Sequence, residues 1–329
     1  MRNSRGPASS ILIREFTMGR SFLPALRVDN RVEVHEAIAQ MLVAQRETLP
    51  PPHLEGGLLR RDVVQAYSNL DIPGVGELRR AATQFLTDVD SNGFLVIRAR
   101  ALLDVTEDED TATDLLTVLL THIGTPLRVF DKWPLWKPIT SRLDVDPMRA
   151  FGVGYNPMHL DLVNATEPPD ISGLFCIQPD PFGEGYSLVS NVRHALADLD
   201  DADRKHLAKP VFRDGVFFDV SGIGAEYDPF PIVDGLPPSE GYIRFTAKML
   251  GERDPDDPAT LAALRLGHRL TARQQRFRLE RGDLLLINQH LACHGREPLG
   301  PGQETIPESQ RRVLRQIFIR NQQQTTVSR

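Results

Sequence analysis

Two residues near the middle of the chain have types and spacing suited to holding a metal ion. His159 and Asp161 are two positions apart within YNPMHLD, residues 155–161. In an extended strand such positions point to the same side, so an imidazole and a carboxylate could reach one ion. His-x-Asp also occurs by chance in many chains, and taken alone this pair fits a solvated loop at least as well.

A third ligand is offered by His294, which lies far downstream in GDLLLINQHLACHGR, residues 282–296. The Gly-Asp pair predicts a turn, residues 284–287 predict a buried strand, and His294 follows at the far end of that strand. His290 is a rival four residues earlier, but without helical periodicity the two histidines need not share a face. Two histidines and a carboxylate are typical of non-haem Fe(II) oxygenases, although zinc hydrolases can use a similar set.

A basic strand near the end of the chain, RRVLRQIFIR at residues 311–320, bears on that choice. Arginines on an otherwise apolar strand are costly to bury without anionic partners. An edge strand with its arginines in water is one interpretation. The other is a guanidinium inside a barrel that binds a dicarboxylate through two parallel hydrogen bonds. Because 2-oxoglutarate is such a dicarboxylate, this strand favours an oxygenase over a zinc hydrolase.

The elements that would position these residues are mostly short strands. Helices are predicted from apolar spacing in four segments, residues 34–46, 77–88, 112–123 and 261–270. One strand is predicted at residues 94–98, and from residue 151 onward short β-like runs alternate with Gly, Pro and Asp. These runs predict a sandwich or barrel, with strands at residues 174–178, 187–190, 212–220, 243–246, 277–279, 284–288 and 313–319.

Composition excludes several classes of function. The net charge of −6 argues against nonspecific nucleic-acid binding, which needs many basic residues. No stretch approaches the roughly 20 apolar residues of a membrane span, and residues 1–14 lack the apolar region of a signal peptide. The two cysteines, Cys176 and Cys293, cannot form a disulfide framework, so a cytoplasmic location is expected. The pattern predicts an irregular segment at residues 1–30, one domain at 31–320 and a flexible tail at 321–329.

The chain from about residue 75 to 320 resembles the taurine dioxygenase and clavaminate synthase-like family of Fe(II)/2-oxoglutarate enzymes. The resemblance lies in the order and spacing of several motifs: QFLTDVDSNGFLVIR (84–98), THIGTP (121–126), His159-x-Asp161, GLFCIQPDPFGEGYSLVSN (173–191) and GDLLLINQHLACHGR (282–296). It implies a mainly β fold with flanking α-helices, a double-stranded β-helix or cupin-like jelly roll. The core would span residues 151–320, with an insertion at about 192–270.

The resemblance also implies roles for particular residues. His159, Asp161 and His294 would hold iron, with His294 preferred over His290. Ser187, 28 residues after His159, stands where the family usually places a threonine that touches 2-oxoglutarate. Arg312, 18 residues after His294, would anchor the distal carboxylate of 2-oxoglutarate, and Arg311 is the alternative if the register slips by one.

Two departures from the family pattern are visible. The usual Asp-Asn pair before the distal histidine is replaced by Asn288-Gln289. Family members often carry a second arginine four residues after the 2-oxoglutarate arginine, to hold an anionic group of the substrate, and this chain has Gln316 there. A neutral amide in place of a cation favours a neutral substrate. Further candidates for binding the substrate are Arg128, Lys132 and Asn156.

The expected activity is hydroxylation of an unactivated C–H bond, with Fe(II), O2 and 2-oxoglutarate as cofactors and succinate and CO2 as products. No catalytic residue beyond the metal ligands is implied, and Asp161 argues against halogenation. The substrate would be a small, neutral molecule derived from an amino acid or peptide, such as a cyclic dipeptide, in natural-product biosynthesis. Two other functions stay open: a zinc-dependent hydrolase with the same triad, and a non-catalytic cupin-like binding module.

Overall fold

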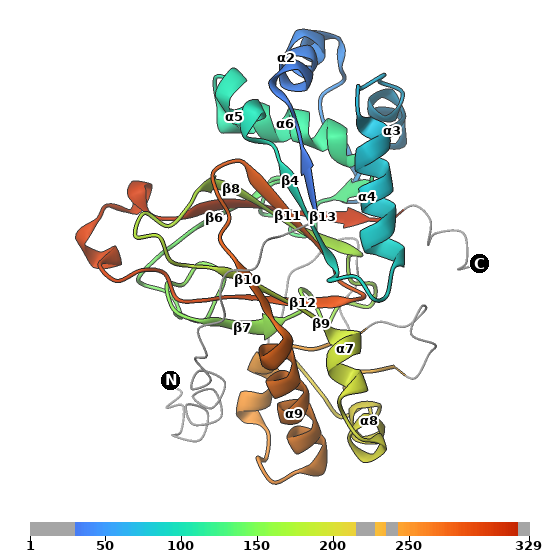
Figure 1. The fold of residues 1–329 in the computed structure, drawn as a ribbon, viewed down its shortest axis with the longest axis vertical. Coiled ribbons are helices and arrows are strands. Elements are labelled where there is room, and N and C mark those ends of the chain that lie inside the picture. Colours follow the sequence, from blue (N-terminus) through green and yellow to red (C-terminus); the bar gives the residue numbers. More distant parts are fainter. Residues whose placement is uncertain (1–29, 215–227, 235–242, 322–329) are drawn as a thin grey trace.

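The protein is a sandwich of two β-sheets with helices on its outer sides (Figure 1). Its structure, a computed structural model, describes residues 30–214, 228–234 and 243–321. One sheet is large and the other has four strands, and the sheets do not close into a continuous barrel. The predicted jelly roll, mainly β with flanking helices, is confirmed.

The large sheet runs in the order β1-β4-β11-β8-β13-β5-β3-β2, and β6 also pairs with β13. Most of its neighbours are antiparallel, and only β1 and β4 are parallel. Its strands are β1 (Arg31–Glu33), β2 (Leu54–Glu55), β3 (Leu58–Leu59), β4 (Phe94–Arg98), β5 (Thr125–Leu127), β6 (Lys137–Thr140), β8 (Ile171–Gln178), β11 (Asp283–Asn288) and β13 (Val313–Arg320).

The central strands of this sheet are buried on both faces, which explains their continuous apolar sequence. In β11, Leu284 and Leu286 pack in the core beneath the N-terminal helices, whereas Leu285 and Ile287 pack in the core between the sheets. Successive side chains of a strand point to opposite faces, so a strand with a core on each side must be apolar at every position.

The small sheet faces the inner side of the large one and runs in the order β10-β9-β12-β7. All its pairs are antiparallel. Its strands are β7 (Asn156–His159), β9 (Ser187–Asn191), β10 (Gln275–Phe277) and β12 (Ala292–Arg296). The fold therefore places β7 and β12 side by side, although they are more than 130 residues apart in the chain, and Asn156 pairs with Arg296.

Helices pack on the outer face of each sheet (Figure 1). Those on the large sheet are α2 (Glu36–Gln45), α3 (Arg61–Ser68), α4 (Val75–Thr87), α5 (Arg100–Val105) and α6 (Glu109–Leu120). Those beside the small sheet are α7 (Val192–Ala197), α8 (Asp201–Leu207) and α9 (Pro258–Arg273). The described residues also form short 3-10 helices: η1 (Arg46–Thr48), η2 (Ala247–Glu252), η3 (Gln303–Thr305) and η4 (Glu308–Gln310). Within the described ranges no helix is both long and apolar enough to cross a membrane.

Side-chain caps explain where two of the longer helices begin. The Asp108 carboxylate accepts a hydrogen bond from the Thr111 amide at 2.7 Å, at the start of α6. The Asp257 carboxylate does the same for the Thr260 amide at 3.0 Å, and a proline follows it at the first position of α9. Each cap satisfies an amide that has no partner within the helix.

Two strand predictions in the insertion were wrong for the residues that the structure describes. Residues 243–246 form isolated bridges, Ile243 with Val233 and Thr246 with His159, and no strand. Phe212 likewise makes one bridge, and residues 215–220 of that predicted strand lie outside the described part. These short apolar runs resemble strands because their side chains are buried against α7, α8 and α9. Phe212 and Phe245, for example, are fully buried there. Of the predicted irregular segment 1–30 and tail 321–329, residues 1–29 and 322–329 also lie outside the described residues.

Candidate metal centre

His159 and His294 lie directly opposite each other on two neighbouring strands. His159 is the last residue of β7 and His294 is the third residue of β12, and the two are Cα partners in the antiparallel register. The sequence predicted that His294 follows the far end of the strand at residues 284–287. In the structure the chain turns after β11, and His294 lies within a further strand, β12, which pairs in the small sheet.

The third candidate ligand, Asp161, lies just past the end of β7. Its Oδ1 is 3.7 Å from Nε2 of His159 and its Oδ2 is 3.8 Å from Nε2 of His294. The three ligand atoms lie within 4.8 Å of one another. Two imidazoles and one carboxylate at such mutual distances can all bind one ion, and they leave the opposite side of that ion to other ligands.

Neighbouring groups hold this carboxylate and one imidazole in place. The Ser172 hydroxyl and the Gln316 amide both donate hydrogen bonds to Oδ2 of Asp161, at 2.6 and 3.2 Å. His159 Nδ1 lies 2.8 Å from the Pro157 carbonyl, which can only accept. The proton of a neutral His159 is therefore on Nδ1, and Nε2 is left with a lone pair for a metal ion.

A glycine beside His294 lets the two strands approach each other. The register of β12 against β7 shifts between His294 and Arg296, and Gly295 occupies the irregular position. A Cβ atom at Gly295 would lie 2.8 Å from the Asn156 carbonyl, closer than real contacts allow. A side chain at this position would push β12 away from β7 and separate the two histidines.

Burial controls the protonation of the three candidate ligands. It lowers the pKa of His159 well below the usual range, and His294 and Lys248 lower that pKa further. Burial also lowers the pKa of His294. Burial by itself would raise the pKa of Asp161, but the imidazoles, the Ser172 hydroxyl and Lys137 together hold it below its ordinary value. At neutral pH the site therefore presents two neutral imidazoles and one carboxylate.

This protonation state makes a prediction about pH. Since a lowered pKa means that each histidine is less than half protonated at about pH 6.5, where an ordinary histidine is half protonated, Fe(II) binding should release fewer protons there than two ordinary histidines would. Two histidines of ordinary pKa would together release about one proton. Calorimetric titration with Fe(II) in two buffers of different ionisation enthalpy measures this number. Release near one proton would contradict the neutral-imidazole state.

A cavity opens beside the three residues, between the two sheets. It holds about 500 Å³ of empty space, including the part open to solvent. Its polar lining comes from both sheets, and its apolar lining comes from Ala150 and from the inner faces of β6, β8, β11 and β13. The polar side chains that line it are Asn156, His159, Asp161, Ser187, His294, Arg296, Arg312 and Gln316.

The alternation of β13 decides which arginine faces the cavity. Arg312, Leu314 and Gln316 line it. Arg315 points the other way, to Glu109 and Asp110 at the start of α6. The Arg311 guanidinium is directed at the backbone carbonyls of the loop before β13. Of the two arginines that the sequence left open as the 2-oxoglutarate anchor, only Arg312 is at the cavity.

The Arg312 guanidinium is buried without an anionic partner. It is 6% exposed, and in the described part of the chain it makes no ion pair and no side-chain hydrogen bond. Burial lowers the pKa of Arg312, and Cys176 and Asp180 partly offset this without forming an ion pair with it. Arg296 lies nearby, and burial together with Arg312 lowers its pKa to about 9, but its guanidinium donates to the carbonyls of Glu297 and Gly154. A buried cation with no counterion is a site for an anion.

Of the remaining candidate binding residues, two line the cavity and two do not. Ser187, the first residue of β9, is buried and lines the cavity. Asn156 also lines it, and its amide oxygen accepts a hydrogen bond from Lys248 at 2.8 Å. Lys132 is exposed, and Arg128 lies 3.6 Å from Asp131. Neither Arg128 nor Lys132 lines the cavity.

Two lysines near the site were missed from the sequence. Lys248, in η2, has its pKa lowered to about 8 by burial and by Arg149. Lys137, at the start of β6, lies across from Gln316 in the register. Burial lowers the pKa of Lys137, and Asp161 partly offsets this. Only the pairing of β6 with β13 brings Lys137 here, so no local motif could have indicated it.

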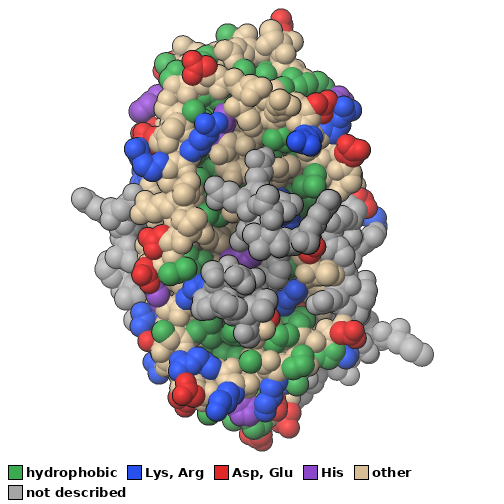
Figure 2. Space-filling model, turned by 90° about the vertical axis from the view of Figure 1, so that its right-hand side faces the viewer, with side chains coloured by type: hydrophobic (Ala, Val, Ile, Leu, Met, Phe, Trp, Pro, Cys, Tyr) green, Lys and Arg blue, Asp and Glu red, His purple; other side chains and the backbone are tan. Residues whose placement is uncertain are grey.

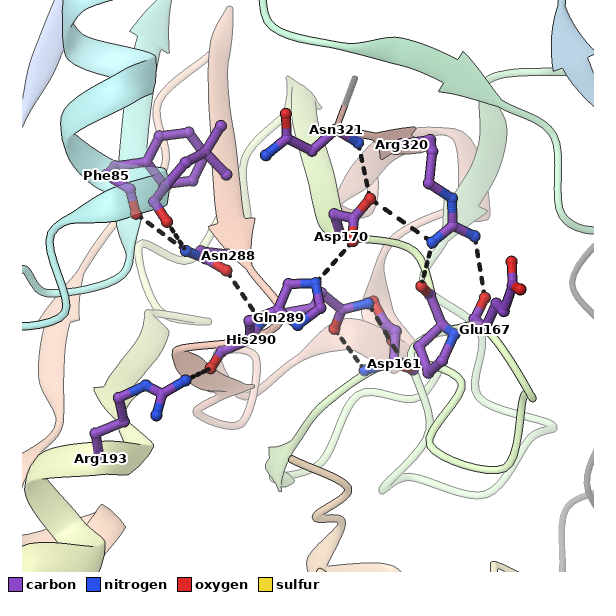
Figure 3. Close-up of polar contacts among 12 residues, drawn as sticks. Phe85, Asp161, Glu167, Asp170, Arg193, Asn288, Gln289, His290, Arg320 and Asn321 are labelled. Carbon is purple, nitrogen blue, oxygen red and sulfur yellow. Dashed lines mark hydrogen bonds and ion pairs between the residues drawn. The ribbon is translucent and has the colours of Figure 1, made fainter. Parts of the chain in front are cut away.

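Three consecutive residues, from the last residue of β11 into the turn before β12, make hydrogen bonds to distant parts of the chain (Figure 3). The Asn288 amide donates to the carbonyls of Phe85 and Leu86 at the end of α4. The Gln289 amide oxygen accepts from the backbone N–H of Asp161 at 2.8 Å. His290 Nε2 lies 2.7 Å from Asp170 Oδ1, so this rival histidine belongs to another cluster. Gln289 therefore positions the candidate carboxylate ligand.

The described surface carries mixed charges. On the face shown in Figure 2, Lys and Arg alternate with Asp and Glu around the rim, and no described patch of one sign extends across it. The net charge of the whole chain is −6. Both features agree with a small-molecule partner better than with a polyanion.

The fold and the two-histidine, one-carboxylate cluster are typical of non-haem iron oxygenases. Residues 56–317 match the family model described as "Taurine catabolism dioxygenase TauD, TfdA family". The match spans most of the chain, and the chain therefore belongs to the TauD/TfdA family. It is a 2-oxoglutarate-dependent dioxygenase that uses Fe(II) and O2.

Several solved structures share this fold. An asparagine oxygenase in complex with Fe(II), 2S,3S-3-hydroxyasparagine and succinate has a TM-score of 0.67 and 19% identity, over 88% of this chain and 93% of that one. The non-heme iron oxygenase OrfP with Fe, succinate and (3S)-hydroxy-L-Arg has a TM-score of 0.67 and 16% identity, over 91% and 97%. OrfP with Fe and alpha-ketoglutaric acid has a TM-score of 0.65 and 17% identity, over the same shares.

Proposed function

We propose that this dioxygenase hydroxylates an unactivated C–H bond of a small molecule derived from an amino acid or a peptide. His159, Asp161 and His294 hold Fe(II) in this proposal, and Arg312 and Ser187 bind the distal carboxylate of 2-oxoglutarate. When bound, iron and 2-oxoglutarate supply the oxidising chemistry, with succinate and CO2 as products. The protein contributes ligation, orientation and a cavity from which much of the water is excluded.

The observation that carries the proposal is the buried Arg312 guanidinium beside the metal cluster. A buried cation without a counterion is costly, and a protein that needed only a zinc site would gain nothing from it. A dicarboxylate that bridges the ion and the guanidinium removes this cost. Ser187 lies on the same cavity and can donate its hydroxyl hydrogen to a carboxylate oxygen.

The nature of the substrate rests on analogy and on the cavity lining. Solved structures of similar fold hold hydroxylated asparagine or arginine in their complexes. This supports an amino-acid-derived substrate and a place in natural-product biosynthesis. Gln316 by itself favours a neutral molecule such as a cyclic dipeptide. However, its amide donates to Asp161, so position 316 contributes to holding the metal ligand as well as to any contact with substrate.

An anaerobic titration tests the proposed function. Adding Fe(II) and then 2-oxoglutarate to the purified protein should produce the weak metal-to-ligand charge-transfer band in the green. Admitting O2 should then yield succinate, and the yield should rise when a substrate is present. Iron binding without the band, or a preference for zinc, would favour the function of a zinc hydrolase over that of an oxygenase. Absence of metal binding would indicate a non-catalytic binding module.

A further inference from the structure

Lys137 lies on the same inner face as the residues that line the cavity. In the antiparallel pair of β6 and β13, Lys137 is the Cα partner of Gln316, and Ile139 is the partner of Leu314. Directly opposite residues of such a pair point to the same side of the sheet. Because Gln316, Leu314 and Ile139 all line the cavity, Lys137 must stand at its edge on the same side.

The Lys137 ammonium group lies among aromatic side chains, and the charge of Asp161 acts on it from the metal cluster without forming an ion pair. Its Nζ lies 4.3 Å from the ring centroid of Phe130 and 5.3 Å from that of Phe151. Trp133 stacks on Phe151, with ring centroids 6.4 Å apart. Within the residues that the structure describes, the ammonium group makes no ion pair and no hydrogen bond. The rings attract the cation and exclude water from it, which strengthens its interaction with any anion that enters.

The position of Lys137 separates it from the proposed 2-oxoglutarate anchor. Arg312 directly precedes β13 and Gln316 is four residues further along, which corresponds to about 13 Å of extended chain. Lys137 stands beside Gln316, whose amide contacts Asp161, so it lies at the metal end of this row. A 2-oxoglutarate molecule that extends from the metal toward Arg312 would not contact Lys137. Lys137 therefore remains available to bind a second molecule, the substrate.

We propose that Lys137 binds a carboxylate of the substrate and thereby supplies, from β6, the cation that β13 lacks at position 316. This inference rests on the proposed function, and it changes the expected substrate from a neutral molecule to one with a free carboxylate. The aromatic side chains Phe130, Phe151 and Trp133 form the walls around that group. Lys137 is then a specificity-determining residue, and a neutral cyclic dipeptide is a poor ligand.

The test uses the full-length protein loaded anaerobically with Fe(II) and 2-oxoglutarate. The probes are the proteinogenic L-amino acids and linear dipeptides, their C-terminal amides, and the matching cyclic dipeptides. Each probe is scored by its perturbation of the charge-transfer band and by succinate formed after O2 is admitted. At least one free acid should perturb the band and stimulate turnover, and its amide should require about 10- to 100-fold higher concentration, since a charge-assisted hydrogen bond is lost.

Variants assign the effect to the residue. Lys137→Met keeps the length of the side chain and removes the charge, and it should raise KM for the free acid about 10- to 100-fold. KM for 2-oxoglutarate and the charge-transfer band without substrate should be unchanged. Lys137→Arg should restore much of the affinity for the acid. Lys205→Met, at an exposed lysine of α8, is the matched control and should behave as wild type.

Each unfavourable result has a distinct meaning. Amides or cyclic dipeptides that act as well as the acids, or no response to any acid, would overturn the assignment of Lys137 and leave the oxygenase intact. Loss of the charge-transfer band in Lys137→Met would also overturn it, because the lysine would then serve iron or 2-oxoglutarate. Absence of the band in the wild-type protein would instead refute the proposed function itself.

Discussion

Replacing His294 with alanine is expected to abolish both iron binding and turnover. His294 supplies one of three ligand atoms that lie within 4.8 Å of one another, and none of the described neighbours offers a further carboxylate or imidazole to this cluster. Loss of a partner in the outer shell of a metal site costs 10- to 100-fold in affinity, so loss of a ligand should cost more than 100-fold. Anaerobic titration with Fe(II), followed by metal analysis of the desalted protein, measures this directly.

The rival histidine gives the matched comparison. His290→Gln keeps a side chain that can donate to Asp170, and it should bind iron as the wild type does, because His290 Nε2 lies 2.7 Å from Asp170 and outside the cluster. If His290→Gln lost iron while His294→Ala kept it, the assignment of the distal ligand would be wrong. Measuring both variants at equal protein concentration separates loss of a ligand from loss of folded protein.

Replacing Arg312 with methionine is expected to have opposite effects on cosubstrate binding and on stability. KM for 2-oxoglutarate should rise by about 100-fold or more, the usual result of truncating one member of a buried charge pair. The protein without 2-oxoglutarate should become equally or more stable, because a buried cation with no counterion is replaced by an apolar group. Steady-state kinetics measures the first effect, and thermal unfolding with and without 2-oxoglutarate measures the second.

Arg311→Met is the control for this experiment. The Arg311 guanidinium donates to the carbonyls of Gln303 and Ile306, so its removal should lower the melting temperature and leave KM for 2-oxoglutarate unchanged. The reverse pattern, with 2-oxoglutarate affinity lost in Arg311→Met and kept in Arg312→Met, would show that the anchor is the neighbouring arginine.

Local sequence was sufficient for the strands that carry most of the core. The apolar run at 284–288 and the run at 94–98 predicted β11 and β4, because strands with a core on both faces have apolar side chains at consecutive positions. The same criterion failed at residues 243–246. There a short apolar run is buried among helices, and periodicity alone does not distinguish these two environments.

The types and spacing of the candidate ligands were also evident from the sequence, but their arrangement was not. The two-residue spacing of His159 and Asp161 predicted that they could share a metal ion, and the pairing of β7 with β12 brings His294 opposite His159. The sequence did not show that β12 is a separate strand, because it is only five residues long and contains Gly295 at a register shift. A run this short that contains glycine and a charged residue has no apolar alternation from which a strand could be predicted.

The amino-acid sequence by itself determined the chemistry that this protein can host: two imidazoles, a carboxylate and a basic strand, within a jelly roll. Only the tertiary structure decided that Arg312 faces the cavity in preference to Arg311 and that the Gln316 amide contacts Asp161. It also brought Lys137 beside Gln316, across 179 positions of the chain. The physical reason is that composition and periodicity are local, whereas the register between strands far apart in sequence determines which side chains meet.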